Sequence, residues 1–269
     1  MDRPVVTLLT DFGTADGYVA AMRGVLCRLC PEARQVTISH EIPPQDVWRG
    51  AWVLATAAPW FPPGTVHLAV VDPGVGTDRR PIVVRAGGQT CVGPDNGLFT
   101  HVLDGDPDAA VHVIARRDLG PRRIAPTFHG RDLFAPAAAH LVRGLAPGDL
   151  GPRIDDPVRL PVEPPRVTGD ALELTVLDVD RFGNVTTNLA RHALVPPRAG
   201  LEPRVGLPGR PPGPLALTYA EAEPGATVVL WGSSDRLEIA RNRDSAAAAL
   251  GLAPGDRIRL ALRWEQPAG

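Results

Sequence analysis

Lysine is absent from this chain of 269 residues, in which all 28 basic residues are arginine. A Walker-type phosphate loop and a Schiff base both require a lysine amine, so the sequence excludes both kinds of site. The formal net charge of −2 gives no overall basic field. Because nucleic acid is bound mainly through basic surfaces, we expect no nucleic-acid partner.

Cysteine is scarce, and the chain contains only Cys27, Cys30 and Cys91. Cys27 and Cys30 have the CxxC spacing, but they lie in an amphipathic helical run, and the chain has no second cysteine pair. A zinc site needs further ligands, so we expect helix packing at these positions and no metal site. An unpaired cysteine also argues against a disulfide framework and is typical of a reducing cytoplasm.

Long apolar runs are missing as well. No segment approaches the roughly 18–20 apolar residues that span a bilayer. The start of the chain, Met1-Asp2-Arg3-Pro4, leads directly into a strand without the pattern of a signal peptide. We therefore expect a soluble cytoplasmic protein with no membrane partner.

The first half of the chain alternates strands and helices. Residues 5–9 form a continuous apolar run, which is typical of a strand buried on both faces of a parallel sheet. This alternation predicts an N-terminal α/β sandwich domain with a mainly parallel sheet over residues 1–152. The other expected elements are strands at 35–39 and 66–71, a hairpin at 81–92, and helices at 17–29, 46–57 and 132–142.

The second half of the chain differs in composition and pattern. Residues 153–168 are rich in proline, which suits an extended linker between domains. Several short runs with strand character follow, together with one short helix near 245–250. This pattern predicts a smaller all-β, barrel-like C-terminal domain over residues 169–269.

Asp11 and Asp72 each follow an apolar strand at its carboxyl end, the edge at which open α/β sheets bind ligands. Asp11 is well placed to accept hydrogen bonds from ribose hydroxyls, and the alternative is that it caps its own turn. Arg79 follows Asp72 across a glycine-containing turn and can fold back to pair with it. The alternative for this pair is a surface salt bridge worth less than ~1 kcal/mol.

His129 lies between Phe128 and Gly130, just before a predicted helix. A helix N-terminus disfavours imidazolium, so this histidine is expected to be neutral and able to accept a proton. The six other histidines lack such surroundings, although His40 also precedes a loop and stays a candidate.

Two polar turns stand out in the second half, at residues 178–188 and 231–235. Asn184 and Ser233 offer directional donors and acceptors of the kind that read a purine edge. Ordinary β-turn chemistry is the alternative for both turns.

Taken together, these segments resemble the S-adenosylmethionine (SAM) hydrolases, also called SAM hydroxide adenosyltransferases, which are related to fluorinases and chlorinases. The resemblance runs in order along nearly the whole chain. It rests on TDFGTADGYVAAMRG at 10–24, SHEIPPQDVWRGA at 39–51, DPGVGTDRR at 72–80, GPDNGLFT at 93–100, PTFHGRDLFAPAAAHL at 126–141, DRFGNVTTNL at 180–189 and LEIARN at 237–242.

The resemblance implies a homotrimer in which SAM, the substrate and not a cofactor, binds between the subunits. It implies that Asp72, Arg79 and His129 position and deprotonate the water that attacks ribose C5′. The resemblance further implies a substrate-binding set: Asp11 and Asp180 on the ribose hydroxyls, and Asn184, Ser233 and the backbone from Arg241 to Arg243 on adenine or methionine. Ser234 stands where the halogenases carry an arginine that contacts the methionine carboxylate.

The same resemblance separates water from halide as the nucleophile. Fluorinase-like enzymes carry a tyrosine at the position of Asp72, a serine at that of Gly130 and a long insertion near residue 87, and this chain has none of these. We therefore expect a SAM hydrolase. A SAM-dependent 5′-halogenase and a SAM- or adenosine-binding protein without turnover are the alternatives.

Overall fold

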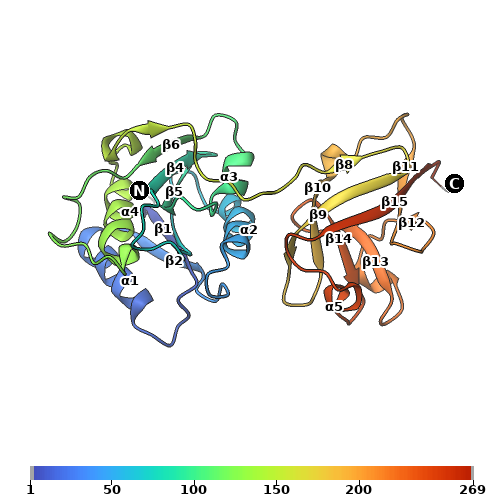
Figure 1. Cartoon of the computed structure of the whole chain (residues 1–269), viewed down its shortest axis with the longest axis horizontal. Helices are drawn as coiled ribbons and strands as arrows, with labels where there is room; N and C mark the ends of the chain where they lie inside the picture. The colour runs from blue at the N-terminus through green and yellow to red at the C-terminus, as the bar shows by residue number, and fades with distance from the viewer. Residues whose placement is uncertain (1–2, 268–269) are drawn as a thin grey trace. The chain divides into compact units, whose positions relative to one another are not determined.

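The computed structural model describes residues 3–267, and it divides into two compact units, Met1–Leu160 and Pro161–Gly269 (Figure 1). The last residues of the first unit are tied to it by hydrogen bonds. The backbone N–H of Val158 donates to Asp95 Oδ1 (2.8 Å), and that of Leu160 donates to Thr100 Oγ1 (2.8 Å). The division therefore lies inside the segment 153–168, for which the sequence predicts a linker.

A sheet with the strand order β2-β1-β3-β5-β4-β6-β7 organises the first unit. Strands β2, β1, β3 and β5 run parallel, whereas β4, β6 and β7 pair antiparallel with their neighbours. The sheet is thus mixed, with a parallel part at β2, β1, β3 and β5. A tight turn at Gly87 and Gly88 (φ 57° and 74°) returns the chain from β4 directly into β5 and makes that pair antiparallel. The strands are β1 (Val5–Thr10), β2 (Arg34–Ser39), β3 (Val66–Val70), β4 (Pro81–Ala86), β5 (Gln89–Pro94), β6 (Ala110–Val113) and β7 (Arg153–Ile154).

Helices cover both faces of this sheet. Leu8 of β1 packs in one core with Met22 of α1 and with α4, whereas its neighbour Leu9 packs in a second core with Leu54 of α2. Strand β1 is therefore buried on both faces, as the apolar run predicts. The helical segments are α1 (Tyr18–Leu29), α2 (Val47–Ala57), η1 (Ala58–Trp60), α3 (Thr100–Asp104), the π-helical turn η2 (Gly130–Phe134), α4 (Ala135–Val142) and η3 (Pro147–Leu150).

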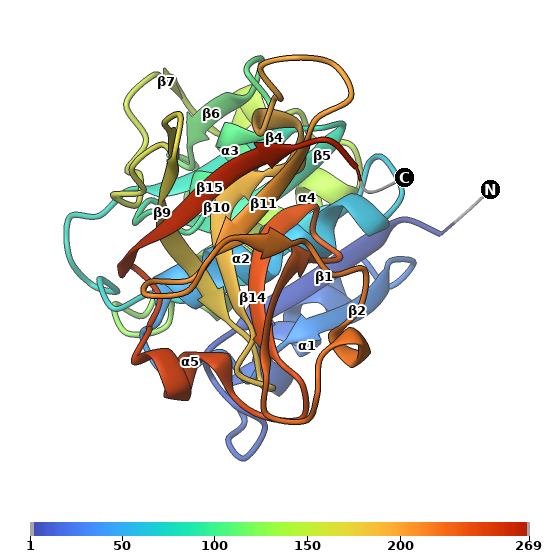
Figure 2. The ribbon, with the colours of Figure 1, turned by 90° about the vertical axis from the view of Figure 1, so that its right-hand side faces the viewer.

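The second unit is built around an antiparallel sheet with the order β12-β11-β15-β9-β10-β14-β13, and β8 also pairs with β9. Figure 2 labels the strands β9, β10, β11, β14 and β15 of this sheet. Leu174 of β9, Ile239 of β14 and Leu260 of β15 belong to one core, with Ala246 of the short helix α5 packed among them. The elements are β8 (Arg166–Val167), β9 (Ala171–Val179), β10 (Val185–Ala190), η4 (Arg191–Ala193), β11 (Glu202–Gly206), β12 (Gly213–Pro214), η5 (Tyr219–Glu221), β13 (Thr227–Trp231), β14 (Arg236–Arg241), α5 (Ala246–Leu250) and β15 (Arg257–Glu265).

Among residues 3–267, no helix combines the length and the apolar character that a membrane crossing requires.

His67 is a fully buried titratable group in the middle of the first sheet. Its Nε2 lies 3.1 Å from Gln89 Oε1, and the amide nitrogen of Gln89 donates to the carbonyls of Ala58 and Phe61. Gln89 Oε1 must therefore accept, so His67 Nε2 carries the proton and Nδ1 accepts from the Thr7 hydroxyl at 2.7 Å. Burial lowers the pKa of His67 below its usual 6.5.

From the burial of neutral His67 we predict how the stability of the protein depends on pH. Unfolding exposes His67 to water, where it binds a proton near pH 6.5, so the free energy of unfolding falls as the pH drops below 6.5. Replacing His67 with Asn should lower the number of protons that the protein takes up on unfolding by up to about one. Urea unfolding between pH 5 and pH 8 measures that uptake. The exposed His192→Asn variant is the control, and equal slopes for wild type and His67→Asn would contradict the prediction.

Candidate functional site

The predicted catalytic residues of the first unit come from three loops at one edge of the sheet. Asp72 lies two residues beyond the end of β3, Arg79 lies two residues before β4, and His129 is the N-cap residue of η2. A π-helical turn next to a candidate site is common, because it re-aims the residues around it.

Asp72, Arg79 and His129 form a continuous hydrogen-bonded chain. Arg79 Nε donates to both oxygens of Asp72 (2.9 and 3.1 Å), and Arg79 Nη2 donates to Asp72 Oδ2 and also lies 2.9 Å from His129 Nδ1. The side chains of Arg79 and Asp72 are only 9% and 4% exposed. The pair is therefore buried, which sets it apart from the surface salt bridge considered as the alternative.

The position of Arg79 fixes the protonation of His129. A guanidinium has only donors, so His129 Nδ1 must accept, and the proton of the neutral imidazole lies on Nε2. Burial, followed by the charge of Arg79, lowers the pKa of His129 below its usual 6.5. The direction agrees with the neutral histidine expected from the sequence, but the causes are desolvation and a neighbouring cation.

Arg79 keeps one unused donor. Its Nη1 is buried and has no hydrogen-bond partner among the described residues, while the guanidinium lies 5.1 Å from the centre of the Phe134 ring. An unsatisfied buried donor costs free energy, so this nitrogen is available to an acceptor that enters the site.

Three aromatic rings form a cluster beside Gly130, the residue that follows His129. Phe12, Tyr18 and Phe128 contact one another with ring centres 5.2–6.1 Å apart. A Cβ added to Gly130 would meet Met22 Sδ at 3.1 Å and the rings of Phe128 and Phe12 at 3.5 and 3.6 Å. The sequence analysis did not select these rings, although Phe12 and Phe128 are the direct neighbours of Asp11 and His129.

Asp11 lies at the same edge of the sheet, immediately after β1. Its Oδ2 accepts a hydrogen bond from the backbone N–H of Gln45 (2.8 Å), whose φ of 66° is unusual for a residue other than glycine. Asp11 thus binds a distant loop and does not cap its own turn.

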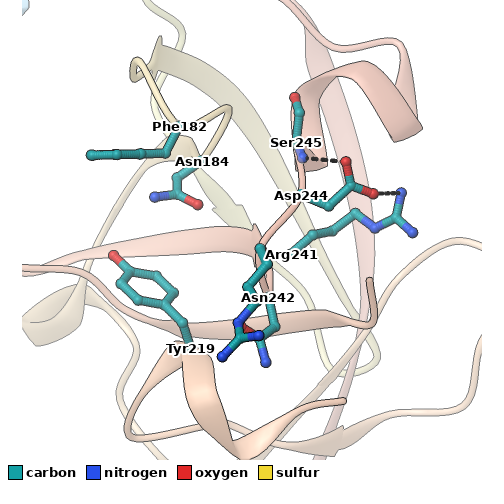
Figure 3. Close-up of a pocket in the computed structure, with 8 residues that line it drawn as sticks. Phe182, Asn184, Tyr219, Arg241, Asn242, Asp244 and Ser245 are labelled. Carbon is teal, nitrogen blue, oxygen red and sulfur yellow. Dashed lines mark hydrogen bonds and ion pairs between the residues drawn. The ribbon is translucent and has the colours of Figure 1, made fainter. Parts of the chain in front are cut away.

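Some of the predicted residues of the second unit lie around a cavity of about 610 Å³ (Figure 3), but Asp180 and Ser233 are not among the residues that line it. Asn184 and the segment Arg241–Arg243 line it, together with the rings of Phe182 and Tyr219. Figure 3 shows the side chain of Asn184 between those two rings. The sequence analysis selected neither ring, since only the polar residues of the turn at 178–188 were considered and Tyr219 lies outside both polar turns.

The charged groups of this unit are largely occupied. Asp180 Oδ1 accepts from the backbone N–H groups of Phe182 and Asn184, and its Oδ2 accepts from the Asn184 amide (3.0 Å). Arg241 donates to the carbonyl of Gly225 and pairs with Asp244 (2.9 Å). Ser233 is exposed, in a turn outside the residues that line the cavity.

Tyr219 is held in the wall of this cavity by a buried carboxyl group. Its hydroxyl donates to Glu238 Oε1 (2.8 Å), and Glu238 is only 7% exposed. Burial raises the pKa of both groups, that of Tyr219 to about 12. A side chain at Gly232 would collide with this carboxylate, since an added Cβ would lie 2.5 Å from Glu238 Oε2.

Cys30 and Cys91 are buried in the first unit, whereas Cys27 is exposed, so the helix packing expected at the two CxxC positions is confirmed for Cys30 and wrong for Cys27. Cys30 is buried, its Sγ donates to the Leu26 carbonyl (3.2 Å), and burial raises the pKa of its thiol to about 11. Within residues 3–267, no group of three histidine, cysteine or acidic side chains is arranged to hold a metal ion.

Comparison with known proteins adds relatives over the whole chain. Residues 6–151 match the SAM hydroxide adenosyltransferase N-terminal domain, and residues 174–259 match the C-terminal domain. An (R)-S-adenosyl-L-methionine hydrolase from Salinispora tropica is 44% identical over 261 residues, which cover 96% of this chain and 97% of the relative. A fluorinase from Actinopolyspora mzabensis is 29% identical over 291 residues, covering 96% and 97%. The crystal structure of an uncharacterized conserved protein from Thermotoga maritima superposes with a TM-score of 0.83 at 36% identity, covering 95% of this chain and 99% of that chain.

From the buried ion pair of Asp72 and Arg79 we predict an effect on the stability of the protein. Asp72→Ala leaves the guanidinium of Arg79 buried without its carboxylate, so we expect the free energy of unfolding to fall by about 3–5 kcal/mol. Urea unfolding measures the loss, and Asp78→Ala, at an exposed position of the same loop, is the matched control. The double change Asp72→Leu with Arg79→Met should recover part of the loss. An Asp72→Ala protein as stable as Asp78→Ala would contradict the prediction.

Proposed function

The chain belongs to the SAM hydroxide adenosyltransferase family, and from that membership we propose that it hydrolyses S-adenosyl-L-methionine to adenosine and L-methionine. Water attacks C5′ of the ribose, and SAM is the substrate and not a cofactor. The name of the relatives specifies (R)-S-adenosyl-L-methionine. Since the L prefix already fixes the α-carbon, the (R) prefix describes the sulfonium, and we extend the preference for this epimer to the present chain.

The observation that carries the proposal is the buried hydrogen-bonded chain of Asp72, Arg79 and His129. A sulfonium releases methionine as a neutral thioether, so the leaving group needs no acid. The reaction lacks a nucleophile, because water is weak and hydroxide is scarce at neutral pH. A site that orients one water and removes its proton supplies what is missing, and general-base help is worth about 10²–10⁴-fold.

The hydrogen bonds suggest a role for each member. Arg79 has no lone pair that could accept the proton of the water, so it cannot be the base. Its Nη1, which has no partner among the described residues, can donate to the attacking oxygen as negative charge develops there. His129 has its Nδ1 occupied by Arg79, so its Nε2–H is a second donor to that oxygen. Asp72 is the anion of the set and takes the proton. The C5′–O bond forms as the C5′–S bond breaks, and the electron pair of the broken bond goes to sulfur.

The remaining residues hold the substrate. Asp11 binds the ribose hydroxyls through the carboxylate oxygen that Gln45 leaves open, and Asp180 makes the same kind of contact from the second unit. Asn184 and the Arg241–Arg243 backbone bind the adenine or the methionine part, and Ser233 contributes to the same contacts from its exposed turn. The rings of Phe182 and Tyr219 and the amide of Asn184, in the cavity of the second unit, suit a planar base.

A homotrimer with sites between subunits and a cytoplasmic location stay predictions of the sequence. Sedimentation of the purified protein tests the first.

Purified protein incubated with each sulfonium epimer of SAM in ¹⁸O-water tests the function. We expect equimolar adenosine and methionine, with the label on the 5′ oxygen and the faster rate for the (R) epimer. Chloride or fluoride added to the same assay tests the halogenase alternative, which predicts that 5′-halo-adenosine outruns adenosine. A binding protein without turnover would leave SAM intact. Either result would overturn the proposal.

Variants of His129 separate a donor from a base. A glutamine amide can donate a hydrogen bond near the position of Nε2, but it cannot accept a proton at neutral pH. His129→Ala should lower kcat by about 10²–10³, the cost of one lost transition-state donor, and His129→Gln should recover much of that loss. Single-turnover rates across pH 5–9 measure both. If glutamine is as inactive as alanine, His129 is the base and the assignment to Asp72 is wrong.

A further inference from the structure

His40 is a buried histidine outside the Asp72–Arg79–His129 set, and it lies just after the end of β2. It is 5% exposed. Its Nδ1 lies 2.9 Å from Thr10 Oγ1, its Nε2 lies 3.3 Å from Thr37 Oγ1, and its carbonyl accepts from the backbone N–H of Gly13 (2.8 Å). One residue therefore contacts both sides of the loop that carries Asp11.

Thr10 links this histidine to the backbone of the loop. The Thr10 hydroxyl is fully buried, and its oxygen accepts from the backbone N–H of Phe12 (3.3 Å). The hydrogen of this buried hydroxyl needs an acceptor, and His40 Nδ1 is the one that the described residues offer, so the hydroxyl donates to Nδ1. This leaves the proton of neutral His40 on Nε2, where it can donate to the Thr37 hydroxyl.

The same loop around His40 also holds Asp11 directly. The backbone N–H of Gln45 donates to Asp11 Oδ2, and the Thr14 hydroxyl donates to Glu41 Oε1 (3.3 Å). Gln45 keeps its positive φ of 66° in making that bond. The segments 10–14 and 40–45 are thus joined at four points, and Asp11 sits among them with Oδ1 unoccupied by any of these bonds.

We propose that His40 is a positioning residue for substrate binding: through Thr10 and Gly13 it fixes the loop that presents the Asp11 carboxylate. This inference rests on the proposed function, in which Asp11 binds the ribose. It concerns binding and not the chemical step, because His40 belongs to a different hydrogen-bond network from the Asp72–Arg79–His129 set.

The arrangement makes binding sensitive to pH. A second proton on His40 would point from Nδ1 at Thr10 Oγ1, and the buried Thr10 hydroxyl would lose its acceptor. The charged groups that face His40 are Arg23 of α1, which opposes protonation, and Glu41 of its own loop, which favours it. Burial is the larger effect and lowers the pKa of His40 below 6.5, so the neutral form prevails at neutral pH.

The first test separates KM from kcat. Thr10→Val and His40→Leu each remove the connection, so the KM for SAM should rise about three- to tenfold, the equivalent of one hydrogen bond, with kcat within about twofold. His40→Asn places an amide oxygen where Nδ1 stands and should keep the KM near that of wild type. The wild-type KM should rise as the pH falls through the pKa of His40, which burial holds below 6.5, and the His40→Asn KM should stay level.

The matched control is the other threonine–histidine pair of the same strand. Thr7→Val and His67→Asn change a buried pair of the same kind, with Thr7 Oγ1 at 2.7 Å from His67 Nδ1. We expect these variants to lose stability without any change in the KM. If they raise the KM as much as Thr10→Val and His40→Leu do, the effect is general destabilisation and the positioning role is wrong.

Binding of adenosine, measured by calorimetry, separates this inference from the proposed function. If SAM is not hydrolysed but adenosine binds wild type and His40→Asn equally and Thr10→Val more weakly, the hydrolase proposal fails and the role of His40 stands. If SAM is hydrolysed and Thr10→Val and His40→Leu leave both the KM and the adenosine affinity unchanged, the role of His40 is overturned. Failure of adenosine to bind wild type overturns it as well.

Discussion

The burial of the Arg79 guanidinium against the Asp72 carboxylate is the constraint on which the candidate site depends. Both side chains are more than nine-tenths buried, so neither charge can be removed without leaving the other uncompensated. Arg79 Nη2 donates to both Asp72 and His129, and Nη1 has no hydrogen-bond partner within residues 3–267. A single ion pair thereby fixes the tautomer of the histidine and supplies an open donor beside it. The chemistry assigned to the three residues follows from that order of hydrogen bonds.

The sheet explains why these groups meet. Asp11 and Asp72 follow adjacent parallel strands, β1 and β3, whose carboxyl ends share one edge. Arg79 reaches Asp72 because the 73–78 segment turns back before β4 begins. His129 arrives from much later in the chain, on the π-helical turn that precedes α4. The loop after β2 adds His40 and Gln45, which hold Asp11 and not the catalytic set. Two separate hydrogen-bond networks, one for binding and one for reaction, thus share an edge of one sheet.

The sequence was informative where local pattern and structure agree. The apolar run at 5–9 predicted a strand buried on both faces, and the sheet has this strand near its parallel end. The expected parallel sheet is confirmed for β2, β1, β3 and β5, and the antiparallel pairing of β4, β6 and β7 makes the whole sheet mixed. That pairing depends on where the expected hairpin at 81–92 joins the sheet. The neutral state of His129 was expected from a helix dipole, but its physical causes are burial and Arg79. Those two causes are tertiary contacts, and no local sequence pattern reports them.

The rings of Phe182 and Tyr219 were missed for the same reason, since their place in a cavity wall depends on strands distant in the sequence.

The protonation of His129 tests the account most directly. Two-dimensional ¹⁵N–¹H spectra of protein labelled on histidine distinguish the two ring nitrogens and their protons. The account predicts, at neutral pH, an unprotonated Nδ1 that accepts from Arg79 and a protonated Nε2. A proton on Nδ1 with a bare Nε2, or an imidazolium, would show that Arg79 does not control this histidine and would contradict the order of proton transfer proposed here.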